Sequence, residues 1–201
     1  MKIGIFGGTF DPPHIGHINA CKSFIKKIDL DQIYVIPVFL PPHKCISSNV
    51  SAENRLEMTK IAFSNLSNRV VVSDMEIKRK GKSYTAETIR YFKDNGYDDI
   101  YFLCGTDMIL SMDTWYKPEY IFKNSKIVYA RRENDEENSI LIDQKCREYR
   151  EKYEAQIILL ELDVIEVSSS EIREAISCKE KLQNFVSKDV YEYITKNKLY
   201  V

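Results

Sequence analysis

The amino-acid sequence predicts an α/β protein built on a doubly wound parallel sheet. Apolar runs of strand length alternate with amphipathic helical segments along the chain, and the connections between them are short. A crossover helix returns the chain to the same edge of a sheet, so strands joined in this way lie parallel. No internal repeat or low-complexity linker interrupts the alternation, and 201 residues suit one such domain with a substantial core.

The first strand–helix–strand unit begins at the N-terminus. Residues 2–6 form a short apolar run that a Gly–Gly pair ends, which predicts a buried strand. Over 15–28 the apolar residues recur every three or four positions and so form one face of a helix. The run 32–39 is rich in β-branched residues and predicts the second strand, with Pro37 marking a bulge or a strand end.

The alternation continues to the C-terminus. Gly96 is expected to close a helix as its C′ residue, and Pro118 suits the first turn of another. The segment 131–139 predicts a charged surface loop, whereas 74–84 and 106–117 show no clear period. The remaining predictions are helices over 53–65, 85–96, 118–124 and 140–153, strands over 69–73, 100–105, 126–130 and 156–162, and a helical remainder.

The composition is that of an ordinary folded protein, with 44% hydrophobic and 29% charged residues. A formal net charge of −1 offers no basic field for a nucleic-acid partner. The five cysteines are odd in number, dispersed and never in a CxxC pair, which indicates reduced thiols in a cytoplasmic protein. The N-terminus lacks the pattern of a signal peptide, and no apolar run reaches transmembrane length, so no membrane partner is expected.

The stretch GGTFDPPHIGH, residues 7–17, is the strongest functional signal. Ligands of open parallel sheets bind beyond the carboxyl ends of the strands, where this stretch is predicted to lie. Its glycines permit positive φ and close approach to a ligand, and its prolines set a helix start near His14. His14 and His17 would then share a face at the positive end of the helix dipole, which suits a phosphate chain. Gly16 between them leaves room for a flat group.

The residues of this stretch also bear on other kinds of site. The dinucleotide pattern GxGxxG and the phosphate loop GxxxxGK[ST] are both absent. His14, His17, His43 and Cys45 are ligand types that zinc accepts, but a histidine pair without defined third and fourth ligands is a weak metal signal. Histidines without a function fit poorly with a pair that shares a turn with glycines and prolines.

A second helix start lies in the segment VSSSEIREAI near the C-terminus. Glu171 falls in its first turn, and Arg173 projects from the same turn. Hydroxyls, free N–H groups and a guanidinium together can clamp a phosphate, although a plain capped helix would have the same pattern. The candidate hydroxyls are those of Ser168, Ser169 and Ser170.

The sequence resembles the nucleotidyltransferase superfamily with the HxGH motif, and within it the bacterial nicotinate-nucleotide adenylyltransferases. The motifs follow the family's order and spacing along nearly the whole chain. They depart from it only conservatively, at Val167, Ser170 and Thr106. The resemblance implies a Rossmann-like fold and one nucleotidyltransferase domain over 1–201, with a helical part from about residue 168. The matching motifs are GGTFDPPHIGH, PPHK, ENRLEM, GKSYTAETI, CGTDM, TW, SSSEIR and VYEYITKNKLY.

The resemblance also implies an activity in NAD biosynthesis. ATP and nicotinate mononucleotide would give nicotinate adenine dinucleotide and pyrophosphate, with Mg²⁺ carried by ATP and no metal site of the protein's own. His14, His17 and Arg173 would be the catalytic residues, holding the phosphates of ATP, and Thr9 would donate to a phosphate oxygen. The implied ATP-binding residues are Gly7, Gly8, Thr9, Phe10, His14, Gly16, His17, Gly105, Asp107, Ser168, Ser169, Ser170 and Arg173.

The acceptor is expected to occupy a separate part of the crevice. Ser83 or Thr85 would cap the following helix and leave N–H groups for a carboxylate. By resemblance, Trp115 would stack on the nicotinate ring and Asp107 would contact the acceptor ribose, whereas composition alone equally allows a core tryptophan. The implied substrate-binding residues are Lys44, Ser83, Tyr84, Thr85, Asp107, Trp115 and Tyr116.

Several alternatives stay open at the level of sequence. One is a related adenylyl- or cytidylyltransferase with another phosphorylated acceptor, and another is a non-catalytic nucleotide sensor. A structural zinc module is the weakest of them. The sequence leaves open whether the chain is a monomer or a homodimer, and whether it prefers nicotinate or nicotinamide mononucleotide.

Overall fold

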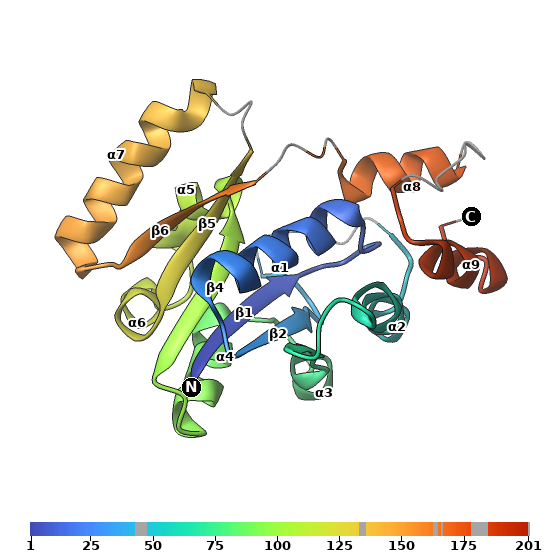
Figure 1. The fold of residues 1–201 in the computed structure, drawn as a ribbon, viewed down its shortest axis with the longest axis horizontal. Helices are drawn as coiled ribbons and strands as arrows, with labels where there is room; N and C mark the ends of the chain where they lie inside the picture. Colours follow the sequence, from blue (N-terminus) through green and yellow to red (C-terminus); the bar gives the residue numbers. More distant parts are fainter. Residues whose placement is uncertain (43–47, 133–135, 163–164, 166, 178–184, 201) are drawn as a thin grey trace.

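The computed structural model describes residues 1–42, 48–132, 136–162, 165, 167–177 and 185–200. Six parallel strands form one sheet in the order β3-β2-β1-β4-β5-β6, which confirms the predicted doubly wound α/β class (Figure 1). The strands are β1 (Lys2–Gly8), β2 (Gln32–Pro37), β3 (Val70–Val72), β4 (Asp99–Gly105), β5 (Lys126–Arg132) and β6 (Ile157–Leu162).

Helices cover both faces of the sheet, and each face has its own hydrophobic core. One core packs β-strand side chains against α1 and α2, and the other packs them against α4, α5, α6 and α7. Among the described residues the helices are α1 (Ile15–Ile28), α2 (Ala52–Phe63), α3 (Met75–Arg79), α4 (Thr85–Asp94), α5 (Thr106–Ser111), the 3₁₀ turn η1 (Met112–Thr114), α6 (Pro118–Asn124), α7 (Glu136–Tyr153), α8 (Ser169–Ser177) and α9 (Lys188–Lys196).

Proline and glycine set several boundaries as predicted. Strand β2 ends at Pro37, Gly96 follows α4 with a φ of 82°, and Pro118 occupies the first turn of α6. The loop predicted over 131–139 is wrong at both ends, because β5 runs to Arg132 and α7 begins at Glu136. The segments 74–84 and 106–117, which show no clear hydrophobic period, contain α3, α5 and η1. These helices are too short to display helical periodicity.

The order of the strands places a topological switch point at the middle of the sheet. Strand β1 has β2 on one side and β4 on the other, so the chain connections diverge from there to opposite edges. Ligands of open α/β sheets bind beyond the carboxyl ends of the strands at such a switch point. The segments that follow β1 and β4 therefore flank the candidate site.

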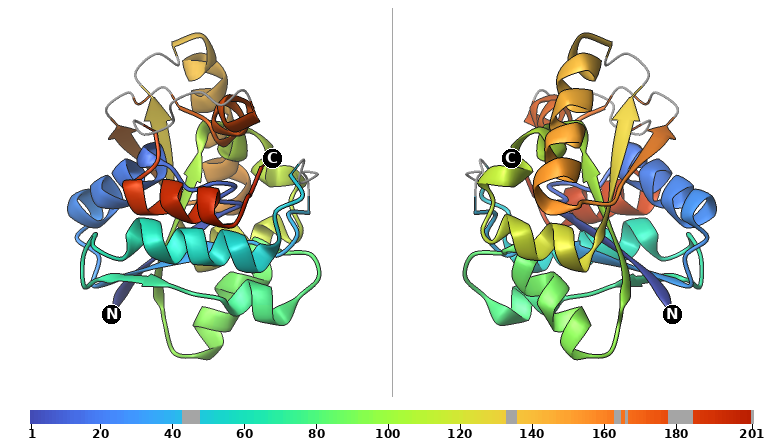
Figure 2. Two further views of the ribbon diagram at one scale, coloured as in Figure 1. Left: turned by 90° about the vertical axis from the view of Figure 1, so that its right-hand side faces the viewer. Right: turned by 90° about the vertical axis from the view of Figure 1, so that its left-hand side faces the viewer.

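The C-terminal helices return to this end of the molecule. Figure 1 shows α8 beside the start of α1, and the left view of Figure 2 shows α9 alongside α2. A third hydrophobic cluster holds them there, with Met58 of α2, Ile172 of α8, and Val190 and Ile194 of α9 among its buried members. The C-terminal helices therefore lie beside the segment that joins β1 to α1.

Two further predictions from the sequence concern the state of the cysteines and the presence of membrane-spanning segments. Cys21, Cys104 and Cys146 are free and buried. Among the residues that the structure describes, every helix is too short or too polar to serve as a membrane span.

Candidate active site at the sheet switch point

The loop after β1 is held by a buried aromatic side chain. Phe10 is 1% exposed, and its ring packs edge-on against Phe6 and Phe63, with centroids 5.4 and 6.0 Å away. Its φ of 48° lies in the left-handed region, where a bulky residue costs about 1–3 kcal/mol. Burial of the ring compensates for that strain, so Phe10 anchors the loop to the core beneath it.

The expectation that the glycine pair supplies the positive φ is therefore wrong. Neither Gly7 nor Gly8 has a positive φ, and Phe10 has it instead. Gly8 instead makes room for a ring: a Cβ there would lie 3.0 Å from the Phe10 ring, a contact that the ring would have to relieve by shifting. A Cβ at Gly7 would meet no atom within 4 Å, so that position faces open space.

Helix α1 begins where the sequence predicts, with His14 as its N-cap. The structure brings the two histidines together, with ring centroids 3.7 Å apart. The backbone N–H of His14 donates to Nδ1 of His17 at 3.2 Å. Because Nδ1 accepts, the neutral ring of His17 carries its proton on Nε2, the atom from which it would donate to a phosphate oxygen.

Gly16 accommodates a histidine rather than a flat ligand group. A Cβ at this position would lie 3.1 Å from two atoms of the His14 imidazole and 3.5 Å from Val167. His14 belongs to the expected phosphate site, and Val167 precedes Ser168, an expected ATP-binding residue at the start of α8. The glycine therefore allows α1, its capping histidine and the α8 segment to pack closely.

The start of α8 has the predicted capping box. Ser168 Oγ accepts from the Glu171 N–H at 3.2 Å, and the Glu171 carboxylate accepts from the Ser168 N–H at 2.7 Å. Ser170 Oγ accepts from Nη2 of Arg173 at 3.1 Å. Ser170, which departs from the family pattern, therefore helps to orient this guanidinium. The first turn of α8 is thus held by hydrogen bonds from its own side chains.

Two hydrogen bonds fasten this turn to the loop before α1. Ser169 Oγ donates to the Pro12 carbonyl at 3.0 Å, and Arg173 Nη1 donates to the Asp11 carbonyl at 2.8 Å. These contacts join segments that are 157 and 162 residues apart in the chain. The structure therefore brings the guanidinium of Arg173 to the loop that leads into the histidine pair.

Arg55 is a residue of this site that sequence reasoning missed. It is 1% exposed, and its guanidinium donates to three backbone carbonyls, those of Thr9 and Val38 at 2.8 Å and of Phe39 at 3.0 Å. Burial lowers the pKa of this guanidinium, against the opposing effect of Asp11. Arg55 ties the loop after β1 to the end of β2. The signal in the sequence was an arginine on the apolar face of α2.

The end of β4 lies beside the end of β1 at the carboxyl edge of the sheet. Gly105 is the N-cap of α5, and Asp107 lies exposed in the first turn of that helix. The hydroxyl of Thr106 donates to the Ala130 carbonyl at 3.3 Å, so this departure from the family pattern adds a tie to β5. Asp107 is therefore at the carboxyl edge of the sheet, beside the loop after β1.

On the acceptor side, one capping prediction is wrong. The N-cap of α4 is Tyr84, without a side-chain cap, and Thr85 is the first helical residue. Ser83 is 6% exposed, and its hydroxyl accepts from the Phe39 N–H at 3.0 Å instead. Ser83 thus fixes the approach to α4 against the end of β2 rather than capping the helix.

The expected aromatic residues do come together near this helix start. The rings of Tyr84 and Tyr116 lie 4.7 Å apart, and Tyr116 is 41% exposed. Trp115 is half-buried and meets Phe102 edge-on, with centroids 6.2 Å apart. The tryptophan therefore borders the core while keeping part of its surface accessible.

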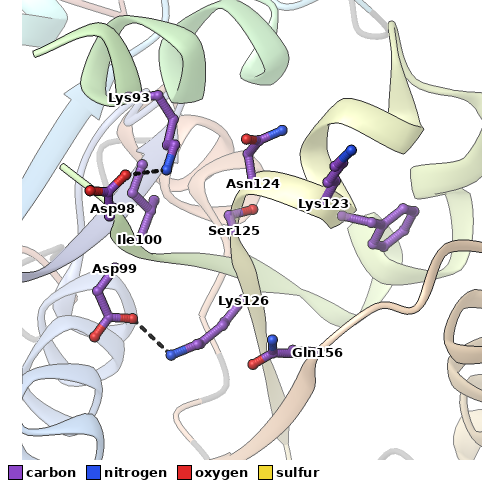
Figure 3. A pocket seen from close by; sticks show the side chains of 10 residues that line it. Lys93, Asp98, Asp99, Ile100, Lys123, Asn124, Ser125, Lys126 and Gln156 are labelled. Carbon is purple, nitrogen blue, oxygen red and sulfur yellow. Dashed lines mark hydrogen bonds and ion pairs between the residues drawn. The ribbon is translucent and has the colours of Figure 1, made fainter. Parts of the chain in front are cut away.

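A surface hollow of about 120 Å³ lies elsewhere, at the amino ends of β4 and β5 (Figure 3). Lys93 pairs with Asp98 at 2.5 Å, and Lys126 pairs with Asp99 at 2.8 Å. These pairs neutralise the lysines, and ligands of such sheets bind at the opposite end. The hollow is thus a poor candidate for the active site.

Comparisons with known proteins decide the family. Residues 5–175 match the cytidylyltransferase-like family model. A protein of Clostridium botulinum described as a probable nicotinate-nucleotide adenylyltransferase is 39% identical over 200 residues, covering 99% of this chain and 98% of that protein. One of the same description from Clostridium acetobutylicum is 37% identical, covering 100% and 99%. This chain belongs to the nicotinate-nucleotide adenylyltransferase family.

The fold is also that of solved members of this family. The nicotinic acid mononucleotide adenylyltransferase of Plasmodium falciparum, complexed with APC, superposes with a TM-score of 0.77 at 20% identity. The match covers 99% of this chain and 96% of that chain. The Rossmann-like nucleotidyltransferase fold implied by the sequence is confirmed.

Lys44, an expected substrate-binding residue, lies outside the described residues. The same holds for His43 and Cys45, the alternative metal ligands. All the other expected site residues are described. They lie at the ends of β1 and β4, in the segments that follow these two strands, in α8 or directly before it, or around the start of α4.

The buried carboxyl group of Glu76 is expected to make the stability of the protein depend on pH. It is 5% exposed, and one carboxylate oxygen accepts from the Thr88 hydroxyl. Burial raises the pKa of Glu76, against the lowering effects of that hydrogen bond, of Ser83 and of Arg79, whereas Glu87 raises it further. In the unfolded chain the group titrates near ~4.3.

A raised folded-state pKa contributes stability below the unfolded value and loses it as the pH rises through the folded value. We therefore expect Glu76→Gln to gain stability relative to the wild type as the pH rises from about 4 to 8. Urea unfolding of both proteins across that range measures the difference. A relative gain of the wild type instead would mean that the contact with Arg79 outweighs burial.

Proposed function

We propose that this protein transfers the adenylyl group of ATP to nicotinate mononucleotide, giving nicotinate adenine dinucleotide and pyrophosphate in NAD biosynthesis. The observation that carries the proposal is the pairing of His14 and His17 at the start of α1, with Arg173 bonded to the loop before them. The names of the relatives support the reaction. A second structure of the Plasmodium falciparum protein is described as a complex with NaAD.

The chemistry requires positioning rather than proton abstraction. The 5′-phosphate of the mononucleotide attacks the α-phosphorus of ATP in line, and a P–O bond forms there as the bond to pyrophosphate breaks. With a second pKa near ~6, the attacking phosphate is already mostly ionised at pH 7, so no general base is needed. The protein has to hold two anions that repel each other and to stabilise charge on the departing pyrophosphate.

The chain's own groups suit that task. The Nε2–H of His17 would donate to a phosphate at the start of α1, where the helix dipole favours anions. The N–H groups of His14 and Ile15 are already engaged, by Nδ1 of His17 and by the Phe185 carbonyl. Arg173 would hold the β- and γ-phosphates, with Thr9 and Lys44 as further donors. On the acceptor side, Trp115 would stack on the nicotinate ring, and Tyr116 with the start of α4 would read its carboxylate.

We infer that Mg²⁺ arrives with ATP. In phosphoryl-transfer sites Mg²⁺ is commonly held by one or two carboxylates together with substrate phosphates. No three His, Cys, Asp or Glu side chains converge within the described part of the chain. When bound, the ion would neutralise part of the triphosphate charge. We also propose one nucleotidyltransferase domain over 1–201 and a cytoplasmic location, which the three free buried cysteines support.

The test is pyrophosphate release from ATP in the presence of candidate acceptors. We expect turnover with nicotinate mononucleotide and none with ATP alone. Nicotinamide mononucleotide in a parallel assay measures the preference between the two. Turnover only with another phosphorylated acceptor, such as phosphopantetheine, would assign a related transferase. ATP binding without turnover on any acceptor would assign a nucleotide sensor.

A further inference from the structure

The hydroxyl of Tyr149, on α7, lies at the point where α5 ends and η1 begins. It donates to the Ile109 carbonyl at 3.0 Å and accepts from the Asp113 N–H at 3.4 Å. These two backbone groups are four residues apart and would pair with each other in a continued α-helix. A side chain that inserts between such groups interrupts the helix, and α5 stops at Ser111.

The ring of Tyr149 is fixed in the core beside this junction. Tyr149 is 1% exposed, and its ring centroid lies 4.8 Å from that of Phe122 on α6. Phe122 also stacks on Tyr153 of α7, with centroids 4.8 Å apart and ring planes 16° apart. Because η1 precedes Trp115 and α6 follows it, α7 holds the chain on both sides of the tryptophan.

The carboxylate of Asp113 adds further contacts with α7. Oδ1 lies 3.0 Å from the Tyr149 hydroxyl, and Oδ2 pairs at 3.1 Å with Nζ of Lys145, which also pairs with Glu148. The single phenol proton can serve either this carboxylate or the Ile109 carbonyl. Burial opposes ionisation of Asp113, but hydrogen bonds from Lys145 and Tyr149 outweigh it and lower the pKa of the carboxyl. At neutral pH the group is therefore a carboxylate that accepts from α7.

The junction is coupled to Trp115 within one turn of chain. The Trp115 N–H donates to the Met112 carbonyl at 3.2 Å, and the Thr114 hydroxyl donates to the Ser111 carbonyl at 2.7 Å. The tryptophan ring itself borders the core through Phe102. A change in the direction of the chain at the junction would therefore be passed on to the tryptophan.

Without the Tyr149 hydroxyl, the Ile109 carbonyl and the Asp113 N–H are left to pair directly, which would extend α5. Each further α-helical residue turns the chain by about 100° around the helix axis, so the tryptophan would take another direction. We propose that Tyr149 is a positioning residue for the acceptor: its hydroxyl ends α5 and so sets the orientation of Trp115 toward the nicotinate ring. The step from the tryptophan to the acceptor rests on the proposed function.

Helix α7 offers two matched controls. Tyr153→Phe removes the same atom as Tyr149→Phe from the same aromatic cluster, one turn further along the helix. Lys145 and Lys152 each lie over a tyrosine ring, with Nζ 5.8 and 4.9 Å from the centroid, and Lys145 in addition pairs with Asp113. Lys145→Met, compared with Lys152→Met, tests the same junction from a side chain that is 25% exposed, so the test does not depend on a core substitution.

Trp115 is the only tryptophan of the chain, so tryptophan fluorescence reports on this position alone. In the ligand-free protein we expect Tyr149→Phe to shift the emission to longer wavelength and to increase quenching by acrylamide, because the ring loses its contact with Phe102. Lys145→Met should change both in the same direction and by less. Tyr153→Phe and Lys152→Met should keep the wild-type emission and quenching.

In turnover, we expect Tyr149→Phe to raise KM for nicotinate mononucleotide about tenfold and KM for ATP less than about twofold. In a Trp115→Ala background the same substitution should have no further effect on KM for the mononucleotide, because the ring that it reorients is gone. An equal rise in both KM values, as a general loss of stability would give, would overturn the proposal. Full additivity with Trp115→Ala would overturn it as well.

The spectra separate this proposal from the proposed function, because they need no substrate. If the acceptor were wrong, turnover with nicotinate mononucleotide would be absent, but the spectral differences between Tyr149→Phe and Tyr153→Phe would persist. If both variants had the wild-type spectrum, Tyr149 would have no positioning role, even with nicotinate mononucleotide as the acceptor.

Discussion

His17→Ala is expected to lower kcat by about 10²–10³, because the variant lacks a preorganised donor to the charge that develops on pyrophosphate. The hydrogen bond from the His14 N–H fixes the ring so that its Nε2–H is the donor. A donor oriented before the reaction needs no reorganisation in the transition state, which is why its loss acts on kcat more than on KM. Steady-state kinetics of pyrophosphate release measure the change.

The His17 ring also packs against Phe10, with centroids 5.0 Å apart, so alanine leaves a small cavity. His17→Phe separates the two effects, since it keeps an aromatic ring but provides no N–H. Both variants should show a similar loss of kcat, whereas His17→Phe should retain more of the thermal stability. A kcat within about threefold of the wild type in both would remove His17 from the phosphate site.

Arg55→Met is expected to lower the free energy of unfolding by about 3–5 kcal/mol, the largest stability effect we foresee for this chain. Methionine fills a similar volume but leaves the carbonyls of Thr9, Val38 and Phe39 buried without their donor. For a chain of this size the loss corresponds to a decrease in Tm of roughly 6–20 °C. Calorimetry and urea unfolding measure it.

Arg69→Met is the matched control. The Arg69 side chain is 48% exposed, and it donates to a single carbonyl, that of Leu30, at 3.1 Å. Water can replace the missing donor there, so we expect a loss below about 1 kcal/mol. If both variants lost a similar free energy of unfolding, the three buried hydrogen bonds of Arg55 would contribute no more to stability than the single exposed one of Arg69.

The loop that Arg55 holds is also the loop that carries the chemistry, and this connects stability to activity. Thr9, Asp11 and Pro12 are each held by a side chain from another segment, through Arg55, Tyr200 and Ser48, and Ser169 respectively. The strained Phe10 lies between them. A loop fixed from several sides can keep the histidine pair in place when two anions bind.

Local sequence was sufficient wherever the deciding interactions lie within a few residues. The end of β2 at Pro37, the start of α1 after His14 and the capping box at Ser168 were all predictable, because each depends on backbone geometry and neighbouring side chains. The alternation of strands and helices also predicted the parallel sheet. The histidine pair was recognisable because an N-cap residue and the residue three positions later meet at a helix start.

Only the tertiary structure decided which distant groups meet. No local pattern assigns the positive φ to Phe10 rather than to its glycine neighbours, or turns the Ser83 hydroxyl from a helix cap to the end of β2. Nor does one bring Tyr200 to Asp11 across 189 residues. Periodicity and capping preferences describe interactions within one element, whereas these contacts arise from packing between elements, which depends on the whole chain.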